Sequence, residues 1–316
     1  MVTRDLTMGI IYLTQTITGI LRNFCLLSHY LYLYCTGCKL RFTDLIIKHL
    51  TAANCLVILS KGVPQTIEAL GMKHFLSDIG CKLVFYVHRV GRDVSICSTW
   101  LLSISQAVSI SSRNTGWAKL KAKSHKYIGS SITLFWMVNL ILNIIPVHVT
   151  ENSRDKNTTK KADYGYCYLV NSDRFMDYGT LYVALLLFRD VFLVALLLWA
   201  SSSMVFTLYR HKQQVQYIHG TNVSSRSSPE SRATLTILIL VSTFVSLFTL
   251  SSIFHISLTV LNNPSFWLVN TTVLIIGSVP TVSPYILMSH DSRVHRVCCA
   301  CTRNTQSPSQ QDGASV

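Results

Sequence analysis

Long apolar segments recur along the chain, separated by short polar stretches. They occupy approximately residues 6–34, 44–70, 79–112, 127–149, 178–209, 233–261 and 266–289. A helix of about 20 mostly apolar residues crosses the ~30 Å hydrocarbon core of a bilayer, and each segment is long enough to do so. Charges interrupt the first two segments, so the count of seven rests on spacing as well as hydropathy, with six or eight as alternatives. The pattern predicts an all-α membrane protein with a seven-transmembrane-helix bundle at 1–290 and a short cytoplasmic tail at 291–316.

The charged residues are few and unevenly placed. Of the 316 residues, 49% are apolar and 13% are charged, which is about half the charge of an average soluble domain. One alternate set of predicted loops holds 14 Lys and Arg and three acidic residues, namely 35–43, 112–126, 210–232 and 290–316. The other set holds seven basic and seven acidic residues. Because basic residues gather on the cytoplasmic side of a membrane, the N-terminus is expected outside and the C-terminus inside, in a multi-pass protein of the plasma membrane.

The net charge of +14 therefore indicates topology and not a nucleic-acid partner. The basic loops lack interleaved aromatic residues and any known nucleic-acid-binding motif. The sequence also lacks GxSxG, HExxH, P-loop and paired-carboxylate motifs, so no enzyme, catalytic residue or cofactor is expected. No internal repeat marks a transporter and no filter sequence marks a pore. A membrane transporter remains a less favoured alternative.

Two cysteines flank the predicted outer mouth of the bundle. Cys81 begins the third apolar segment at its outer end, and Cys167 lies in the loop before the fifth. A disulfide can persist in the oxidising extracellular compartment, and a bridge here would contribute about 2–4 kcal/mol. The alternative is that each cysteine packs independently as a small apolar residue. The Cys35-Thr-Gly-Cys38 stretch has no second pair nearby, so no metal site is expected.

Other candidate modifications lie outside the apolar segments. Asn157 opens an Asn-Thr-Thr sequon in the long predicted outer loop and is a candidate for glycosylation. Cys298, Cys299 and Cys301 follow the last apolar segment on the predicted inner side. Cysteines beside a membrane are candidates for palmitoylation. Both predictions use the orientation that the loop charges indicate.

Ionisable residues interrupt the apolar segments, where a charge is costly and by default indicates a functional site. The six that define the candidate ligand pocket are Lys61, Arg89, Arg92, Asp93, Arg189 and Asp190. Arg89 and Asp93 are four residues apart and share one helix face, so they are expected to pair within the helix and leave Arg92 facing a cavity or a partner. Lys61, just before Pro64, is expected to border the outer cavity.

Two interpretations of this charge cluster stay open at the level of sequence. In the first, its three arginines form a cationic pocket for an anionic or carbonyl-bearing ligand. In the second, its two aspartates, together with Glu68, close the arginines into a structural network. The residue types and their spacing favour neither interpretation.

Several longer stretches are specific enough to compare with known families. In the first inner loop and second helix they are Thr36-Gly37-Cys38-Lys39-Leu40-Arg41, Thr43-Asp44-Leu45-Ile46, Lys48-His49-Leu50 and Ser60-Lys61-Gly62-Val63-Pro64-Gln65-Thr66. In the third helix they are Gly80-Cys81-Lys82-Leu83 and His88-Arg89-Val90-Gly91-Arg92. Later ones include Gly165-Tyr166-Cys167, Leu198-Trp199-Ala200-Ser201-Ser202-Ser203-Met204, Ser227-Ser228-Pro229-Glu230-Ser231-Arg232 and Pro280-Thr281-Val282-Ser283-Pro284. Together they resemble vomeronasal type-1 receptors from about residue 19 to 290.

The resemblance implies a G-protein-coupled pheromone receptor of sensory neurons, which binds small semiochemicals and activates an inhibitory-class heterotrimeric G protein. It also implies a Cys81–Cys167 disulfide and a glycan at Asn157. Gln106 stands where other receptors carry the arginine of an Asp-Arg-Tyr motif. Contact with the G protein is therefore expected to use an electrostatic surface, formed by Gln106, Arg113, Lys119, Lys121, Lys123, Arg210 and Lys212. A bitter-taste-like receptor, which has a similar layout, is the alternative within receptors.

Four residues depart from the pattern that the resemblance leads us to expect. Glycine is expected at Arg22, proline at Arg189, a small residue at Asp93 and a smaller cysteine at Trp100. A charge at the centre of a membrane helix costs roughly 2.5–3.5 kcal/mol on insertion scales. These changes either reshape the pocket or reflect drift in a receptor under little selection.

Overall fold

The computed structural model describes most of the seven apolar segments. It covers residues 2–37, 42–111, 115–144, 159–163, 166, 168–172, 175–219, 239, 242–254, 257 and 265–290. The elements are α1 (Val2–Cys35), α2 (Phe42–Val57), the π-helical turn η1 (Ile58–Gly62), α3 (Val63–Ala69), α4 (Asp78–Ser111), α5 (Thr115–Leu142), β1 (Thr159–Asp163), β2 (Tyr168–Ser172), α7 (Phe175–His219) and α9 (Phe266–His290). A further short helix spans Ser242–Phe254. Each predicted apolar segment thus contains a helix among the described residues.

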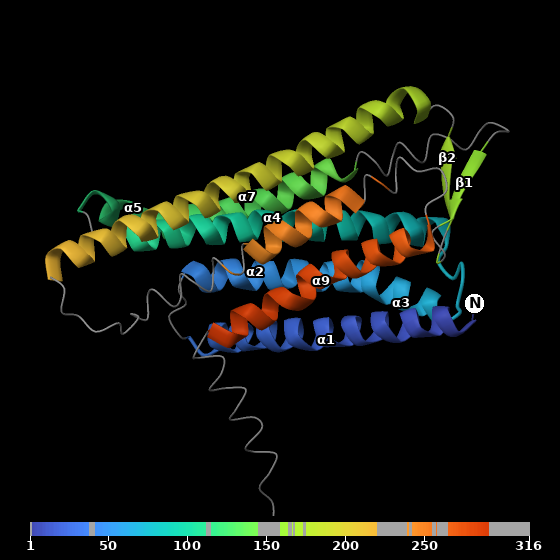
Figure 1. The fold of residues 1–316 in the computed structure, drawn as a ribbon, viewed down its shortest axis with the longest axis horizontal. Helices are drawn as coiled ribbons and strands as arrows, with labels where there is room; N and C mark the ends of the chain where they lie inside the picture. Colours follow the sequence, from blue (N-terminus) through green and yellow to red (C-terminus); the bar gives the residue numbers. More distant parts are fainter. Residues whose placement is uncertain are drawn as a thin grey trace, which may run out of the picture.

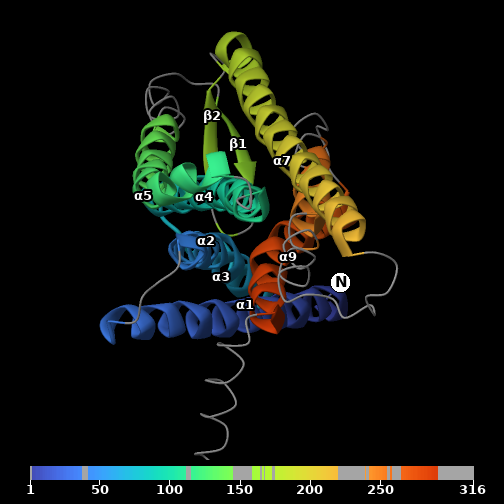
Figure 2. The same ribbon diagram turned by 90° about the vertical axis from the view of Figure 1, so that its left-hand side faces the viewer.

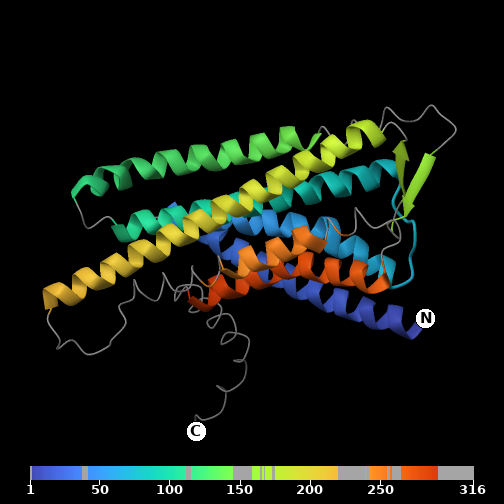
Figure 3. The same ribbon diagram turned by 45° about the horizontal axis from the view of Figure 1, so that its top comes forward.

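The helices run side by side along one long axis (Figure 1). Viewed from one end, α1 lies at one edge of the bundle and α4 lies between α2, α5 and α7 (Figure 2). The N-terminus and the β1–β2 hairpin lie at one end of this axis, and the C-terminal ends of α1, α4, α7 and α9 lie at the other (Figures 1 and 3). The apolar core at that second end joins α1, α2, α4, α5 and α9 through residues such as Leu26, Ile46 and Leu102.

The surface of the bundle is apolar and much of its interior is polar. Along α1, many large apolar side chains are exposed, among them Leu6, Ile10, Ile11, Leu13, Ile17, Leu21, Phe24 and Leu31. Asn23, Asp93 and Thr99, in contrast, are completely buried. An exposed apolar surface of this extent suits hydrocarbon and not water. By length and composition, Leu6–Cys35, Thr43–Ala69 and Trp267–Met288 can each cross a membrane, and α4 and α7, with 34 and 45 residues, exceed the length that a span needs.

Two sequence-based expectations about the loops are wrong. The basic stretch at 112–126 was expected as a loop, but it is helical from Thr115 onward, and α7 continues through 210–219. Alanine and lysine favour helix. Residues 117–128 and residues 210–219 contain no Gly or Pro that would end a helix. The bundle is helical as expected, and a short hairpin precedes α7, where β1 and β2 pair antiparallel with Asp163 opposite Tyr168.

The second span changes from α-helix to π-helix over Ile58–Gly62, the stretch that contains Lys61. Pro64 has no N–H to donate to the carbonyl four residues earlier, and its ring crowds that carbonyl. The preceding turn widens to the π-helical η1, in which the Val63 N–H donates to the Ile58 carbonyl. Gly62 allows α1 to approach closely, because a Cβ there would lie 3.0 Å from the Thr16 hydroxyl oxygen. Such π turns often occur at functional sites, and this one carries Lys61.

Polar side chains compensate for the prolines of α9. Pro284 cannot donate to the Pro280 carbonyl, and the Asn23 side chain of α1 donates to that carbonyl at 2.8 Å. Beside it, Asn54 of α2 donates to the Ser283 hydroxyl at 2.7 Å and accepts from Ser95 of α4 at 2.8 Å. These bonds join four spans near the middle of the bundle.

Replacement of Asn23 by alanine is expected to destabilise the bundle by about 1–3 kcal/mol, because the buried Pro280 carbonyl would lose its donor. Surface delivery and the thermal midpoint of the purified protein should both fall. Thr51→Ala is the control, because that buried hydroxyl donates within its own helix to Ile47. Equal midpoints for the two variants would contradict the role assigned to Asn23.

Candidate functional site

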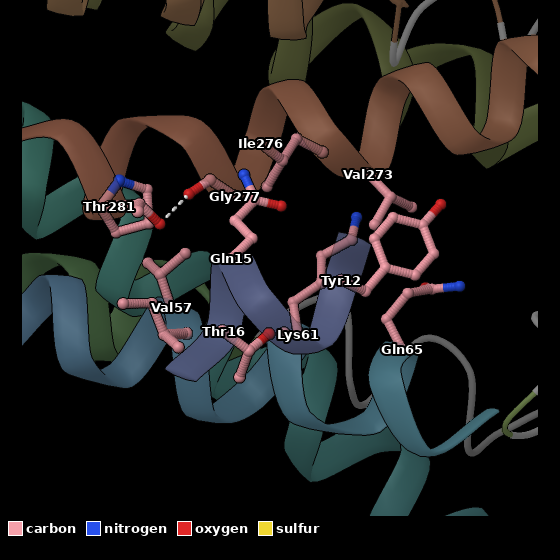
Figure 4. A pocket seen from close by; sticks show the side chains of 13 residues that line it. Tyr12, Gln15, Thr16, Val57, Lys61, Gln65, Val273, Ile276, Gly277 and Thr281 are labelled. Atoms are coloured by element: carbon pink, nitrogen blue, oxygen red, sulfur yellow. Dashed lines mark hydrogen bonds between the residues drawn. The ribbon is translucent and has the colours of Figure 1, made fainter. Parts of the chain in front are cut away.

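A small cavity, partly open at the surface, lies between α1, the η1 region and α9 (Figure 4). Its polar lining residues are Tyr12, Gln15, Thr16, Lys61, Gln65 and Thr281. Most of these groups already have protein partners. Tyr12 donates to the Asn270 side chain, and Gln15 donates to the Leu274 carbonyl at 3.0 Å. The bonded groups form a fixed wall that holds α1 against α9.

Lys61 differs from the rest of this lining. Its ammonium group makes no hydrogen bond or ion pair with any residue that the structure describes. The described lining of this cavity contains no Asp or Glu, and the nearby Gln65 donates to Glu68 on the next turn of α3. The side chain is partly buried, so water can replace its missing partners only in part. Lys61 therefore borders a cavity, as the sequence predicted.

A second small cavity lies between α2, α4, the 242–254 helix and α9. The two cavities share three lining residues, Val57, Ile276 and Pro280, so they adjoin. Phe244 and Phe248 form much of the apolar wall of the second cavity, and Arg92 is its charged lining residue. Together the two cavities form a space whose described lining carries basic residues and no acidic ones.

The charge of Arg92 is neutralised by an aspartate that does not line the second cavity. Its guanidinium is 2.7 Å from the Asp190 carboxylate of α7 and donates to the Ser252 hydroxyl at 3.2 Å. It also lies over the Phe248 ring, 4.6 Å from the ring centre. The buried Nε of Arg92 has no hydrogen-bond partner among the described residues. Arg92 thus links α4 to α7 and to the 242–254 helix while bordering the cavity.

The pairing expected between Arg89 and Asp93 is wrong. Asp93 is completely buried and pairs across to α7, where Arg189 Nη1 lies 2.8 Å from its carboxylate. Asn143 of α5 donates to the same carboxylate oxygen at 3.1 Å. The i,i+4 spacing identifies neighbours on one helix. Here Asp93 pairs instead with Arg189 of another helix, which neutralises the buried carboxylate. Arg89 is partly buried and lines neither cavity.

The arginines Arg92 and Arg189 therefore form a structural network with Asp93 and Asp190, and not a free cationic pocket. Arg189 also lies 3.5 Å from Asp190, so two cations and two anions alternate between α4 and α7. The third acid expected in this network, Glu68, lies on α3 and accepts from Gln65. Of the six candidate pocket residues, Lys61 and Arg92 border the cavities.

Three of the four departures from the expected pattern have partners of their own. The charges Asp93 and Arg189 pair with each other, so one compensates for the other. Arg22 lies over the Tyr285 ring of α9, 5.0 Å from the ring centre, which offsets part of the cost of its charge. Trp100, the fourth, packs edge-on against Phe135 of α5.

Sequence reasoning missed Tyr12, Gln15 and Thr16, which lie on one face of α1 at helical spacing. That periodicity was the available signal, because three polar residues at i, i+3 and i+4 in an apolar helix indicate an inward face. It also missed Asn143, which no local pattern distinguishes.

The remaining predicted residues are only partly described. Gln106 lies on α4, the lysines 119, 121 and 123 on α5, and Arg210 with Lys212 on α7. Arg113, Asn157, Cys167, Cys298, Cys299 and Cys301 lie outside the described residues. Cys81 at the start of α4 is completely buried and disulfide-bonded, and it packs with Tyr166.

The exposed apolar helices, polar interior and inter-helical cavities define a multi-pass helical membrane protein. The model of the vomeronasal organ pheromone receptor family matches residues 6–300. Vomeronasal type-1 receptor 4 of Homo sapiens is 51% identical over 304 residues, covering 96% of this chain and all of that protein. Vomeronasal type-1 receptor 3 of Homo sapiens is 50% identical over 311 residues, covering 98% and 99%. Vomeronasal type-1 receptor 100 of Rattus norvegicus is 31% identical over 287 residues, covering 90% and 86%.

This chain belongs to the vomeronasal type-1 receptor family. It is therefore a membrane receptor and not an enzyme. The family assignment also decides between the alternatives, because neither the bitter-taste-like receptor nor the transporter fits a match over nearly the whole chain.

Proposed function

We propose that this chain is a pheromone receptor of the plasma membrane that detects small semiochemicals and activates an inhibitory-class heterotrimeric G protein. The observation that carries the proposal is the family match over residues 6–300. The two adjoining cavities between the helices support it, because they offer a small molecule a partly apolar space inside the bundle.

The proposed topology has seven transmembrane helices in one receptor domain at 1–290, with the N-terminus outside and a cytoplasmic tail at 291–316. Its support is the charge of the two ends. The C-terminal ends of α1, α4, α7 and α9 share one end of the bundle (Figure 1), and the predicted loops there carry twice as many basic residues as the opposite loops. The β1–β2 hairpin lies at the other end.

In the proposed mechanism, a ligand in the cavities biases a two-state helix arrangement. Arg92 borders the second cavity and is bonded to Asp190 of α7 and Ser252 of the 242–254 helix. A ligand that contacts Arg92 therefore acts on the bonds between three spans. Movement of α7 relative to α4 would carry the change along the helices to the cytoplasmic end.

The proposed G-protein surface lies at that end, where α7 projects past the ends of α1, α2 and α9 (Figure 3). Its members are Gln106 on α4, Arg113, the lysines 119, 121 and 123 on α5, and Arg210 and Lys212 on α7. Because parts of these segments are helical and not loops, their charges are spaced on rigid elements.

Three further features of the proposal concern residues outside the described ones. The proposed partner of Cys81 in its disulfide is Cys167. Two observations support this pairing: Cys81 is disulfide-bonded, and Tyr166, the residue before Cys167, packs against Cys81. Asn157 carries a glycan on the outer side. Cys298, Cys299 and Cys301 are palmitoylated beside the inner leaflet.

Replacement of the lysines 119, 121 and 123 by glutamine is expected to weaken G-protein activation about tenfold or more, since complementary charge mainly speeds association. Surface delivery and ligand affinity should not change. The matched control replaces Lys73, Lys82 and Lys160 near the opposite end. Equal losses in the two triple variants would contradict the assigned surface.

The receptor assignment is tested by measuring cyclic AMP in cells that express the tagged chain at their surface. A panel of volatile, steroid and acidic compounds should contain members that lower cyclic AMP, and pertussis toxin should abolish the effect. Substrate uptake without G-protein activation would contradict the proposal.

A further inference from the structure

Lys61 is a cation that the described protein leaves uncompensated. Two of the other basic residues expected in the pocket, Arg92 and Arg189, each have an aspartate within 2.8 Å. Lys61 has no such partner among the described residues, although it is partly buried beside a cavity. A charge removed from water and left unpaired costs free energy, so the site as it stands favours an incoming anion.

The fold holds Lys61 at this position. The π turn that Pro64 imposes carries Lys61, and Gly62 allows the turn to lie directly against Thr16 of α1. Thr16 is itself bonded to Thr66, at 3.2 Å between their hydroxyl oxygens. Contacts with α1 and α3 therefore hold the backbone that carries Lys61, and this lowers the conformational entropy lost when Lys61 binds a ligand.

The second cavity, which adjoins the Lys61 cavity, offers apolar side chains that the hydrocarbon part of a ligand could contact. Beyond the shared residues Val57, Ile276 and Pro280, the second cavity has an apolar side formed by Phe244, Phe248, Ile96 and Val279. Its other lining residues are polar or charged: Asn54, His88, Arg92, Ser95 and Ser251. A flexible hydrocarbon group entering from Lys61 would contact these apolar side chains, and Arg92 lines the same cavity. Arg92 retains one buried donor, Nε, without a partner among the described residues.

We propose that Lys61 anchors the carboxylate of a small amphiphilic acid whose hydrocarbon portion fills the second cavity. This inference rests on the proposed function, because it names the ligand class and anchor for that receptor. The ammonium donates charge-assisted hydrogen bonds to the carboxylate, and the apolar walls discriminate among hydrocarbon lengths. A matching alcohol has the same hydrocarbon and lacks the charge.

The test measures binding to the purified full-length chain in an uncharged maltoside detergent, free of anionic lipid. Octanoate and decanoate are titrated beside octanol and decanol, and the thermal midpoint is followed as each probe is added. The variants are Lys61→Met, Lys61→Arg and Lys61→Glu. Lys48→Met is the matched control, since Lys48 lies on α2 over the Tyr34 ring, away from both cavities.

The carboxylates are expected to raise the midpoint and the alcohols to bind at least tenfold more weakly. Lys61→Met should weaken carboxylate binding by about 10- to 100-fold, and Lys61→Arg and Lys48→Met should retain most of it. Lys61→Glu should instead favour octylammonium over octanoate. That reversal shows a folded site, because an unfolded variant would bind neither probe.

Equal binding of acids and alcohols would overturn the proposal. Octanoate binding that is unchanged in Lys61→Met would overturn it too, because the acids would then partition into the detergent or bind elsewhere on the protein. The outcome is separable from the proposed function. Carboxylate binding without G-protein activation would overturn the signalling role alone, and activation only by neutral compounds would overturn the Lys61 site alone.

Discussion

Replacing Arg189 with leucine is expected to abolish most surface delivery. The change leaves the completely buried Asp93 without the cation that lies 2.8 Å from it. Removal of one partner of a buried ion pair costs about 3–5 kcal/mol, because the remaining charge stays in a poor solvent. Among the described residues, Asn143 would then be the remaining side-chain donor to that carboxylate, and one amide hydrogen bond does not replace a full charge. Surface labelling of tagged wild type and variant in the same cells measures the loss.

The double variant Asp93→Ser with Arg189→Leu provides the decisive control. It removes both charges and restores the small residue that the family pattern predicts at 93. Asp93→Ser alone leaves Arg189 beside Asp190 at 3.5 Å, so its loss should be smaller. The double variant should recover most surface delivery, with a coupling of about 0.5–3 kcal/mol. If the two losses simply add, Asp93 and Arg189 are not the compensating pair that the structure shows.

Cys81→Ser is expected to have the next largest effect. Cys81 is disulfide-bonded near the start of α4 and completely buried against Tyr166. Loss of a native disulfide typically costs about 2–5 kcal/mol, since the freed loop regains conformational freedom in the unfolded state. Surface delivery and the thermal midpoint should both fall, and reducing agent should lower the wild-type midpoint toward that of the variant.

Two comparisons separate the bond from the packing. Cys55→Ser changes a buried cysteine that forms no disulfide, so it should cost less. Cys167→Ser should reproduce Cys81→Ser, and the double variant should be no worse than either. A double variant with twice the loss would show that the two cysteines stabilise the protein independently.

The sequence predicted the helices well and the ends of the helices poorly. Each apolar segment contains a helix because the bilayer requires internal hydrogen bonding across a fixed length. The same reasoning says nothing of where a helix stops in water. The helical residues from Thr115 and beyond Arg210 follow from local helix propensity. The strands β1 (Thr-Lys-Lys-Ala-Asp) and β2 (Tyr-Leu-Val-Asn-Ser) lack the alternation of apolar and polar residues that would have predicted them.

The candidate site shows a similar division. Sequence identified Lys61 and Arg92 as ionisable residues beside a cavity, because charge inside a membrane segment is rare. It gave Asp93 the wrong partner, since spacing along one helix cannot report that α7 brings Arg189 to 2.8 Å. Whether a basic residue has an acidic partner, as Arg92 does, or lacks one, as Lys61 does among the described residues, depends on packing between helices. No local sequence pattern reports that packing.

The most direct test of the receptor assignment measures cyclic AMP and surface delivery in the same cells, with and without the compound panel. The expected result is a dose-dependent fall in cyclic AMP, which requires the surface-delivered receptor and disappears with pertussis toxin. Good surface delivery with no compound-dependent G-protein activation, together with compound uptake that the chain itself confers, would contradict the account.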